Sequence, residues 1–143
     1  MNKSSSHLYN CSWTYKIGGH LDLGELERCI QLIIEFFPSF RTYFTQGSDG
    51  TIEKAILKDG KSSSVIQYIN FEDSSLSQKS QKKAAINFLK KELVINFELN
   101  GGILYRFYVT SYGVDKHCLM LVQHHLVSDA ISGGIFTKAL SYL

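Results

Sequence analysis

The sequence has few of the features that mark secreted, metal-binding or membrane proteins. Its three cysteines, Cys11, Cys29 and Cys118, lie far apart and match no Cys-x-x-Cys spacing. Each falls within an apolar pattern, where free cysteine behaves as a small buried residue. The segment from Met1 to His7 is polar and precedes no apolar run, so it has the pattern of neither a signal peptide nor an anchor. No segment approaches the length of a membrane span. We therefore expect a cytoplasmic protein with reduced cysteines and no membrane partner.

An excess of one sign of charge is also missing. The 15 lysines and arginines against 13 aspartates and glutamates leave a formal net charge of +2, with both signs mixed along the chain. A nucleic-acid-binding face needs clustered basic residues, so we expect no nucleic acid partner. With 143 residues, 44% of them hydrophobic, the chain is long enough for one core. We predict a single domain over residues 1–143.

The first part of the chain predicts a strand followed by a helix. Apolar residues alternate with polar ones between Leu8 and Ile17, which is typical of a half-buried strand. Asp22 and Glu25 have the spacing of a helix cap and its reciprocal carboxylate, and the apolar residues after them recur at helical spacing. We expect this helix to end at Pro38.

The rest of the chain predicts five more strands and two more helices. The strands are expected at Phe40–Phe44, Thr51–Leu57, Val65–Phe71, Ile103–Ser111 and His117–His124, the helices at Ser77–Leu93 and from Ser132 onward, and a polar loop at Lys58–Ser64. Lysines on the polar side of the Ser77–Leu93 helix are interpreted as its solvated face. The apolar run Cys118–Val122 is typical of a central strand covered on both faces. The sum is an α+β fold with a mixed or antiparallel sheet of about six strands and three helices.

Polar residues gather where this apolar run ends. Gln123, His124 and His125 follow it directly, and Ser128 and Asp129 come shortly after. Buried polar groups are costly unless they are paired or used. Adjacent strand side chains point to opposite faces, so we expect one histidine to be structural and the other functional. A neutral histidine is suited to accept a proton from an attacking amine or hydroxyl.

The histidine pair by itself leaves other interpretations open. A hydrogen-bonded structural pair is the plainest one for two histidines at a strand end. A metal site would need a third ligand, and beyond Asp129 and His117 the sequence offers none at helical or turn spacing. We therefore predict no metal.

Four segments, in order along the chain, resemble one family. The segment His124-His125-Leu126-Val127-Ser128-Asp129-Ala130 resembles the H-H-x-x-x-D-G signature of condensation domains and their acyltransferase relatives. Gly19-His20-Leu21-Asp22 resembles their G-x-L-D segment, and Phe40-Arg41-Thr42-Tyr43-Phe44 resembles their L-R-T-x-F strand. Asn96-Phe97-Glu98-Leu99 and Gly101-Gly102-Ile103-Leu104-Tyr105-Arg106 are similar to their P-F-D-L and G-P-L-x-R segments. The chain is identified as the N-terminal lobe of a condensation domain of a nonribosomal peptide synthetase.

The resemblance implies a chloramphenicol acetyltransferase-like fold, in which two lobes enclose a tunnel. Donor and acceptor groups enter that tunnel as phosphopantetheine thioesters of peptidyl or acyl carrier proteins, and an amine attacks the thioester to form an amide. By resemblance, the catalytic residues are His125, which positions or deprotonates the amine, and His124, which supports it from the opposite face. Asp129 is implied to be an anchor that pairs with an arginine, and Arg41 to organise the core. The chain itself is expected to bind no cofactor, because phosphopantetheine or coenzyme A only carries the substrate.

Two departures from the family pattern shape the functional prediction. Ala130 replaces the motif glycine, so a turn that needs a positive φ there would be strained. The chain ends at Leu143, and we expect the C-terminal lobe to be absent. Catalysis in this fold needs reactants positioned by both lobes, so the isolated lobe is expected to be inactive.

Two alternative functions remain open at this point. The first is a coenzyme A-dependent O- or N-acyltransferase of the same superfamily. The second is a non-catalytic lobe that binds a carrier protein, a second condensation-type lobe or a second copy of itself through an exposed apolar face.

Overall fold

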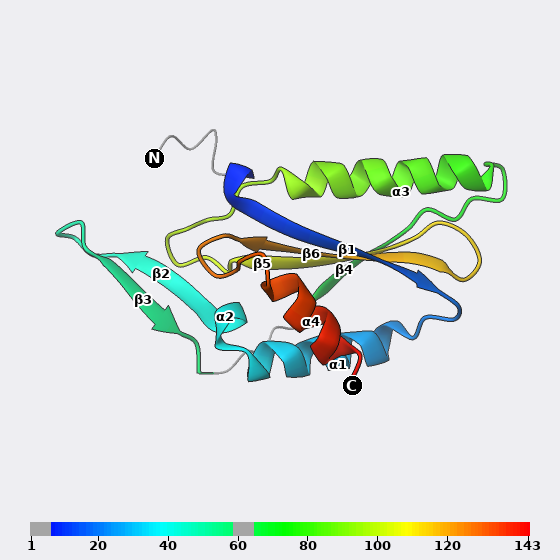
Figure 1. The fold of residues 1–143 in the computed structure, drawn as a ribbon. Helices are drawn as coiled ribbons and strands as arrows, with labels where there is room; N and C mark the ends of the chain where they lie inside the picture. Colours follow the sequence, from blue (N-terminus) through cyan, green and yellow to red (C-terminus); the bar gives the residue numbers. More distant parts are fainter. Residues whose placement is uncertain (1–6, 59–64) are drawn as a thin grey trace.

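The computed structural model describes residues 7–58 and 65–143, which form a sheet with helices on both faces (Figure 1). In chain order the elements are β1 (Asn10–Gly18), α1 (Leu23–Phe36), α2 (Pro38–Arg41), β2 (Thr42–Gln46), β3 (Ile52–Ile56), β4 (Ile66–Asn70), α3 (Gln78–Leu93), β5 (Tyr105–Ser111), β6 (Lys116–His124) and α4 (Ser132–Leu140). Four strands form one sheet in the order β1-β6-β5-β4. β4 and β5 are parallel and the other pairs antiparallel, so the predicted α+β class with a mixed sheet is confirmed.

The six predicted strands are all present, but they do not share one sheet. β2 and β3 pair with each other as a separate antiparallel hairpin that projects from the body (Figure 1). In β3 only Ala55 is partly buried, and the other four residues are exposed. Its two isoleucines, Ile52 and Ile56, are exposed, so β3 does not pack against the main sheet.

A short helix, α2, takes the place of the first half of the predicted Phe40–Phe44 strand. Pro38 occupies its first turn, where a missing N–H is tolerated, and the Thr42 hydroxyl donates to the Pro38 carbonyl at 2.9 Å. The turn directs Phe40 into the core, where its ring centroid lies 5.9 Å from that of Phe107. The strand therefore begins at Thr42, and the described residues hold this helix in addition to the three predicted.

Helix α1 begins where the sequence predicts, but its capping is one-sided. The Asp22 carboxylate accepts a hydrogen bond from the Glu25 amide at 3.0 Å. The Glu25 carboxylate does not return to Asp22; it pairs with Arg28, with 2.6 Å between Glu25 Oε1 and Arg28 Nη2. A charged partner one turn away competes successfully with a neutral amide. The reciprocal half of the predicted cap was wrong.

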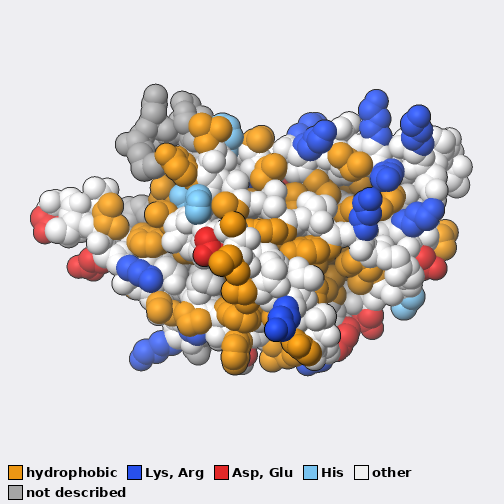
Figure 2. All heavy atoms as spheres, viewed as in Figure 1, with side chains coloured by type: hydrophobic (Ala, Val, Ile, Leu, Met, Phe, Trp, Pro, Cys, Tyr) orange, Lys and Arg blue, Asp and Glu red, His pale blue; other side chains and the backbone are white. Residues whose placement is uncertain are grey.

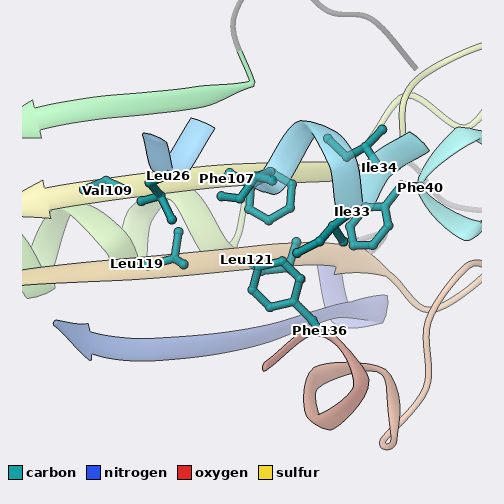
Figure 3. Close-up of a cluster of buried hydrophobic side chains, with 10 residues drawn as sticks. Leu26, Ile33, Ile34, Phe40, Phe107, Val109, Leu119, Leu121 and Phe136 are labelled. Carbon is teal, nitrogen blue, oxygen red and sulfur yellow. The ribbon is translucent and has the colours of Figure 1, made fainter. Parts of the chain in front are cut away.

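The core lies on both faces of β6, the inner strand between β1 and β5. Leu119 and Leu121 point toward α1 and α4, where they pack with Phe107 and Phe136 (Figure 3). Met120 and Val122 point to the opposite face, which α3 covers. The prediction of a central strand covered on both sides is confirmed, because β6 alternates between two hydrophobic clusters.

Cys11, Cys29 and Cys118 are free. Within the described ranges, no helix is both long and apolar enough to cross a bilayer. The polar N-terminal segment through residue 6 and the predicted loop over residues 59–64 lie outside the described residues.

Candidate functional site

The two motif histidines stand at the end of β6 and face opposite sides of the sheet. His124 pairs with Asn10 of β1, and the His125 amide still donates to the Tyr9 carbonyl at 2.8 Å, so the ladder continues one residue past the strand. His124 is 2% exposed, whereas His125 lies at the surface. Alternation along the strand therefore separates one buried histidine from one accessible histidine.

Hydrogen bonding fixes the protonation state of His124. Its Nδ1 lies 3.2 Å from the Leu126 amide, which can only donate. Nδ1 therefore keeps its lone pair, and the proton of the neutral ring is on Nε2. Burial, and secondarily the nearby His125, lowers the pKa of His124. The ring packs between Tyr9 and Phe97, at centroid distances of 6.0 and 6.1 Å, as a neutral part of the core.

The stability of the chain should decrease more steeply on acidification in the wild type than in His124→Asn. Because the folded-state pKa of His124 is lowered, the unfolded chain binds more protons below its own histidine pKa of about 6.5. The stabilisation is complete above that pH and is lost as the pH falls toward the folded-state pKa. Asparagine places a non-titrating Oδ1 where Nδ1 accepts from Leu126. Urea unfolding midpoints at about pH 7.5 and about pH 5 test this. An equal decrease of the midpoint between the two pH values in wild type and His124→Asn would contradict it.

Hydrogen bonding also fixes the tautomer of His125, with the opposite result. Its Nδ1 lies 2.7 Å from the Ser128 carbonyl oxygen, which can only accept. In the neutral ring Nδ1 therefore carries the proton and Nε2 presents a lone pair. The turn behind it is held by the Val127 amide and the Ser128 hydroxyl, both of which donate to the His124 carbonyl, at 3.0 and 3.2 Å. The site thus presents a fixed, accessible imidazole nitrogen that can accept a proton.

Asp129 is used as a cap for the turn into α4. Its Oδ1 accepts from the Ile131 amide, the Ser132 amide and the Ser132 hydroxyl, at 3.1, 3.0 and 2.8 Å. The Ser132 hydroxyl and these amides lower the pKa of Asp129. Within the described residues the three arginines bind elsewhere: Arg28 to Glu25, Arg41 to carbonyls of Ile34, Leu57 and Lys58, and Arg106 to the Ile95 carbonyl and the Phe97 ring. None of the three is shown in contact with Asp129, and the pairing of Asp129 with an arginine stays a prediction.

Asp129→Asn should lower the melting temperature less than Asp129→Ala, which should lower it by a few degrees. Asparagine keeps an Oδ1 that can accept from the same amides, and alanine does not. The ionised Asp129 carboxylate stabilises the folded state fully above the unfolded carboxyl pKa of about 3.9. This stabilisation is lost as the pH falls through the lowered folded-state pKa. Thermal unfolding followed by circular dichroism at neutral pH measures both variants. Equal destabilisation of the two would show that the charge matters and the cap does not.

The structure also places the two supporting residues that the sequence predicts, Ala130 and Arg41. Ala130 is exposed, and Asp115 is the only non-glycine residue with a positive φ in the described ranges, so the turn at Ala130 does not require a glycine conformation. The Arg41 guanidinium lies 2.6 Å from the Leu57 carbonyl and 3.3 Å from the Ile34 carbonyl, which ties the end of α1 to the segment after β3. Arg41 therefore connects elements of the fold.

Sequence reasoning missed the contact that positions the start of α4. A Cβ atom at Gly133 would overlap the Trp13 indole ring of β1, and the Tyr15 hydroxyl donates to the Gly133 carbonyl at 3.1 Å. Two aromatic residues of β1 thus hold the first turn of α4 against the sheet. The available signal was the pair Gly133-Gly134 at the start of a predicted helix, since glycine is unfavourable there without a packing reason.

Comparisons with known proteins identify the family. The family model described as Condensation domain matches residues 1–143. The chain belongs to the condensation-domain family. Bacitracin synthase 3 of Bacillus licheniformis is 27% identical over 133 residues, covering 92% of this chain and 2% of that protein. Phosphinothricin tripeptide synthetase PhsB of Streptomyces viridochromogenes is 26% identical over 139 residues, covering 94% of this chain and 11% of that protein.

Solved condensation domains share the fold of this chain. The starter condensation domain of rhizomide synthetase RzmA superposes with a TM-score of 0.82 at 16% identity, covering 96% of this chain and 32% of that structure. The chain thus spans about a third of that domain and a small part of the synthetases that it resembles. The family assignment, the fold and the N-terminal-lobe identification are confirmed.

Proposed function

We propose that this condensation domain helps to form amide bonds in nonribosomal peptide synthesis, with His125 accepting or guiding the proton of the attacking amine. The observation that carries the proposal is the 2.7 Å contact between His125 Nδ1 and the Ser128 carbonyl. It leaves the Nε2 lone pair accessible in the neutral ring and orients the ring through Nδ1, as a positioned general base requires. His124 is neutral and buried, and its role is to support the turn.

The reaction can be written with His125 as the only protein group that handles a proton. The acceptor amine attacks the donor thioester carbonyl, so a C–N bond forms and the C–S bond breaks. Nε2 takes the amine proton and returns one to the departing sulfur, which leaves as a thiol. The donor and acceptor are proposed to arrive on the phosphopantetheine arms of carrier proteins in the cytoplasm, and the chain itself needs no cofactor.

The proposed tunnel requires a second wall, because His125 lies at the surface of the described structure. Positioning two reactants supplies a large part of the rate enhancement in such reactions. We therefore propose that the 143-residue chain contributes one wall, which holds the histidine motif, and that amide formation needs the opposite lobe.

A condensation assay tests this function. The chain is assayed alone and joined to the second lobe of a condensation domain, with an aminoacyl carrier as acceptor and an acyl donor on either a carrier protein or coenzyme A. Mass spectrometry of the product should show the amide only with the joined protein and only from the carrier-bound donor. Preferential use of coenzyme A would instead support the alternative acyltransferase. Turnover by the chain alone would contradict the need for a second wall.

An apolar groove favours the non-catalytic alternative, in which the lobe binds a partner or a second copy of itself. An apolar groove of about 550 Å³ lies between α1 and α4, lined by Leu32, Ile33, Phe36, Phe37, Ile135, Lys138, Ala139, Tyr142 and Leu143. Figure 2 shows hydrophobic side chains gathered over this part of the molecule, with lysines over α3. Exposed apolar surface favours association. Light scattering of the purified chain distinguishes a monomer from a self-associated form.

A further inference from the structure

A second, smaller cavity lies beside the histidine motif, between α2, α4 and the end of β6. Its volume is about 70 Å³. The apolar part of its wall comes from Phe37, Phe40, Ile135 and Phe136, and the polar part from Ser39, Gln123 and Ser132. None of the described residues that line the cavity is charged. The cavity is therefore a small neutral space with polar groups on an otherwise apolar wall.

Gln123 is the unusual member of this wall. It is 2% exposed, and it has the same strand parity as Leu119 and Leu121, so its side chain points into the layer of α1 and α4. Within the described part of the chain, the structure shows no hydrogen bond to its side-chain amide. Its main chain is covered by β1 and β5 on either side, so the surface it gives to the cavity comes from the side chain.

A second buried glutamine shows how such a side chain is normally satisfied. Gln81 is 9% exposed, and its Nε2 donates to the Asp73 and Leu76 carbonyls at 2.7 and 3.0 Å. Buried amides without partners are rare, because leaving water without forming a replacement bond is unfavourable. The Gln123 side chain lines the cavity instead, so its amide is available there to solvent or to a ligand.

The chemistry of the cavity selects the kind of group that fits. A carboxamide offers one acceptor and two donor hydrogens, so its best partner is a group that both donates and accepts. A charged group would be desolvated without a counter-ion on the wall. At roughly 30 Å³ per water, the space holds about two waters or one group of a few heavy atoms. A neutral amide meets all three conditions.

The cavity is also close to the proposed chemistry. Gln123 and His125 share a face of β6 and are two residues apart, about 7 Å along a strand. We propose that this cavity is a substrate subsite in which Gln123 binds a neutral amide group of the substrate next to His125. The inference rests on the proposed function. Two parts of a carrier-bound substrate contain such an amide, an amino-acid side chain and the pantetheine arm.

Nuclear magnetic resonance of the 143-residue chain tests the subsite without any condensation reaction. The Gln123 side-chain amide is assigned by its absence in Gln123→Met. Propionamide represents an amino-acid carboxamide, pantetheine represents the carrier arm, and propionate is the charged control. We expect saturable shifts of the Gln123 resonance with one of the two amides, with a Kd on the order of 1–10 mM. The probe that binds identifies the source, and its affinity should fall about tenfold in Gln123→Met.

The Gln81 amide serves as the internal reference and should not shift. Thermal unfolding gives a second readout: Gln81→Met should lower the melting temperature by about 2–4 °C or more, whereas Gln123→Met should leave it unchanged or raise it. A Gln123 resonance that moves with neither amide, or equally with propionate, would overturn the subsite. So would a loss of stability in Gln123→Met equal to that in Gln81→Met. Because no turnover is measured, these results leave the assignment of His125 as the base untouched.

Discussion

His125→Ala is expected to lower amide formation by about 10²- to 10⁴-fold, the range for loss of a positioned general base. The loss should appear mainly in kcat, because the ring acts on the proton of the attacking amine and not on the carrier protein. The His125 ring is hydrogen-bonded to the Ser128 carbonyl, and the residue is exposed. The free energy of unfolding should therefore change by no more than about 0.5 kcal/mol.

The matched control is His20→Ala, which removes an exposed histidine near the opposite end of the β1–β6 pair. It should retain full activity. Rates are measured with the joined two-lobe protein and carrier-bound substrates, and circular dichroism confirms that both variants fold. A His125→Ala protein with more than half of the wild-type rate would remove the basis for the proposed chemistry.

Gly133→Ala is expected to lower the free energy of unfolding by about 1–3 kcal/mol, the usual cost of forcing extra atoms into a packed site. Alanine is favoured over glycine inside a helix by about 1 kcal/mol, so the overlap with the Trp13 indole has to outweigh that gain. The displaced first turn of α4 includes Ser132, which bonds with Asp129. The stability loss should thus be accompanied by a disturbed motif loop.

The adjacent glycine gives a direct comparison. A Cβ at Gly134 would meet open space, so Gly134→Ala should raise the free energy of unfolding by about 0.5–1 kcal/mol. Gly133→Ala should cost less stability in a Trp13→Ala background than in the wild type, because the clashing ring is gone. Urea unfolding of the wild type, the three single variants and the double variant measures these differences. A destabilisation of Gly133→Ala that is fully retained in the double variant would exclude the Trp13 contact as its cause.

Long periodic segments were predictable because each carries its own signal. β6 was recognisable from its continuous apolar run, and α3 from apolar residues at helical spacing with lysines on the other side. The region around Pro38 was not, because Phe40 to Phe44 is apolar enough for a strand. The first turn of α2 is decided by the aromatic packing of Phe40 in the core. Tertiary contacts override local propensity in such short segments.

The histidine motif shows the same division between local and tertiary information. The sequence by itself determined that His124 and His125 lie at the end of a buried strand on opposite faces, because alternation is a property of every strand. It also determined the family, through four segments in a fixed order. Which nitrogen of each ring carries the proton depended on the contacts with Leu126 and Ser128 in the folded turn.

The roles of Asp129, Gly133 and Gln123 were decided only by the tertiary structure. Asp129 meets the amides of α4 within its own turn, Gly133 meets the indole of Trp13 near the other end of the chain, and Gln123 lines a cavity between α2 and α4. Residue order records periodicity and motif spacing. It does not record which side chains are brought within hydrogen-bonding or van der Waals distance once the sheet and helices pack together.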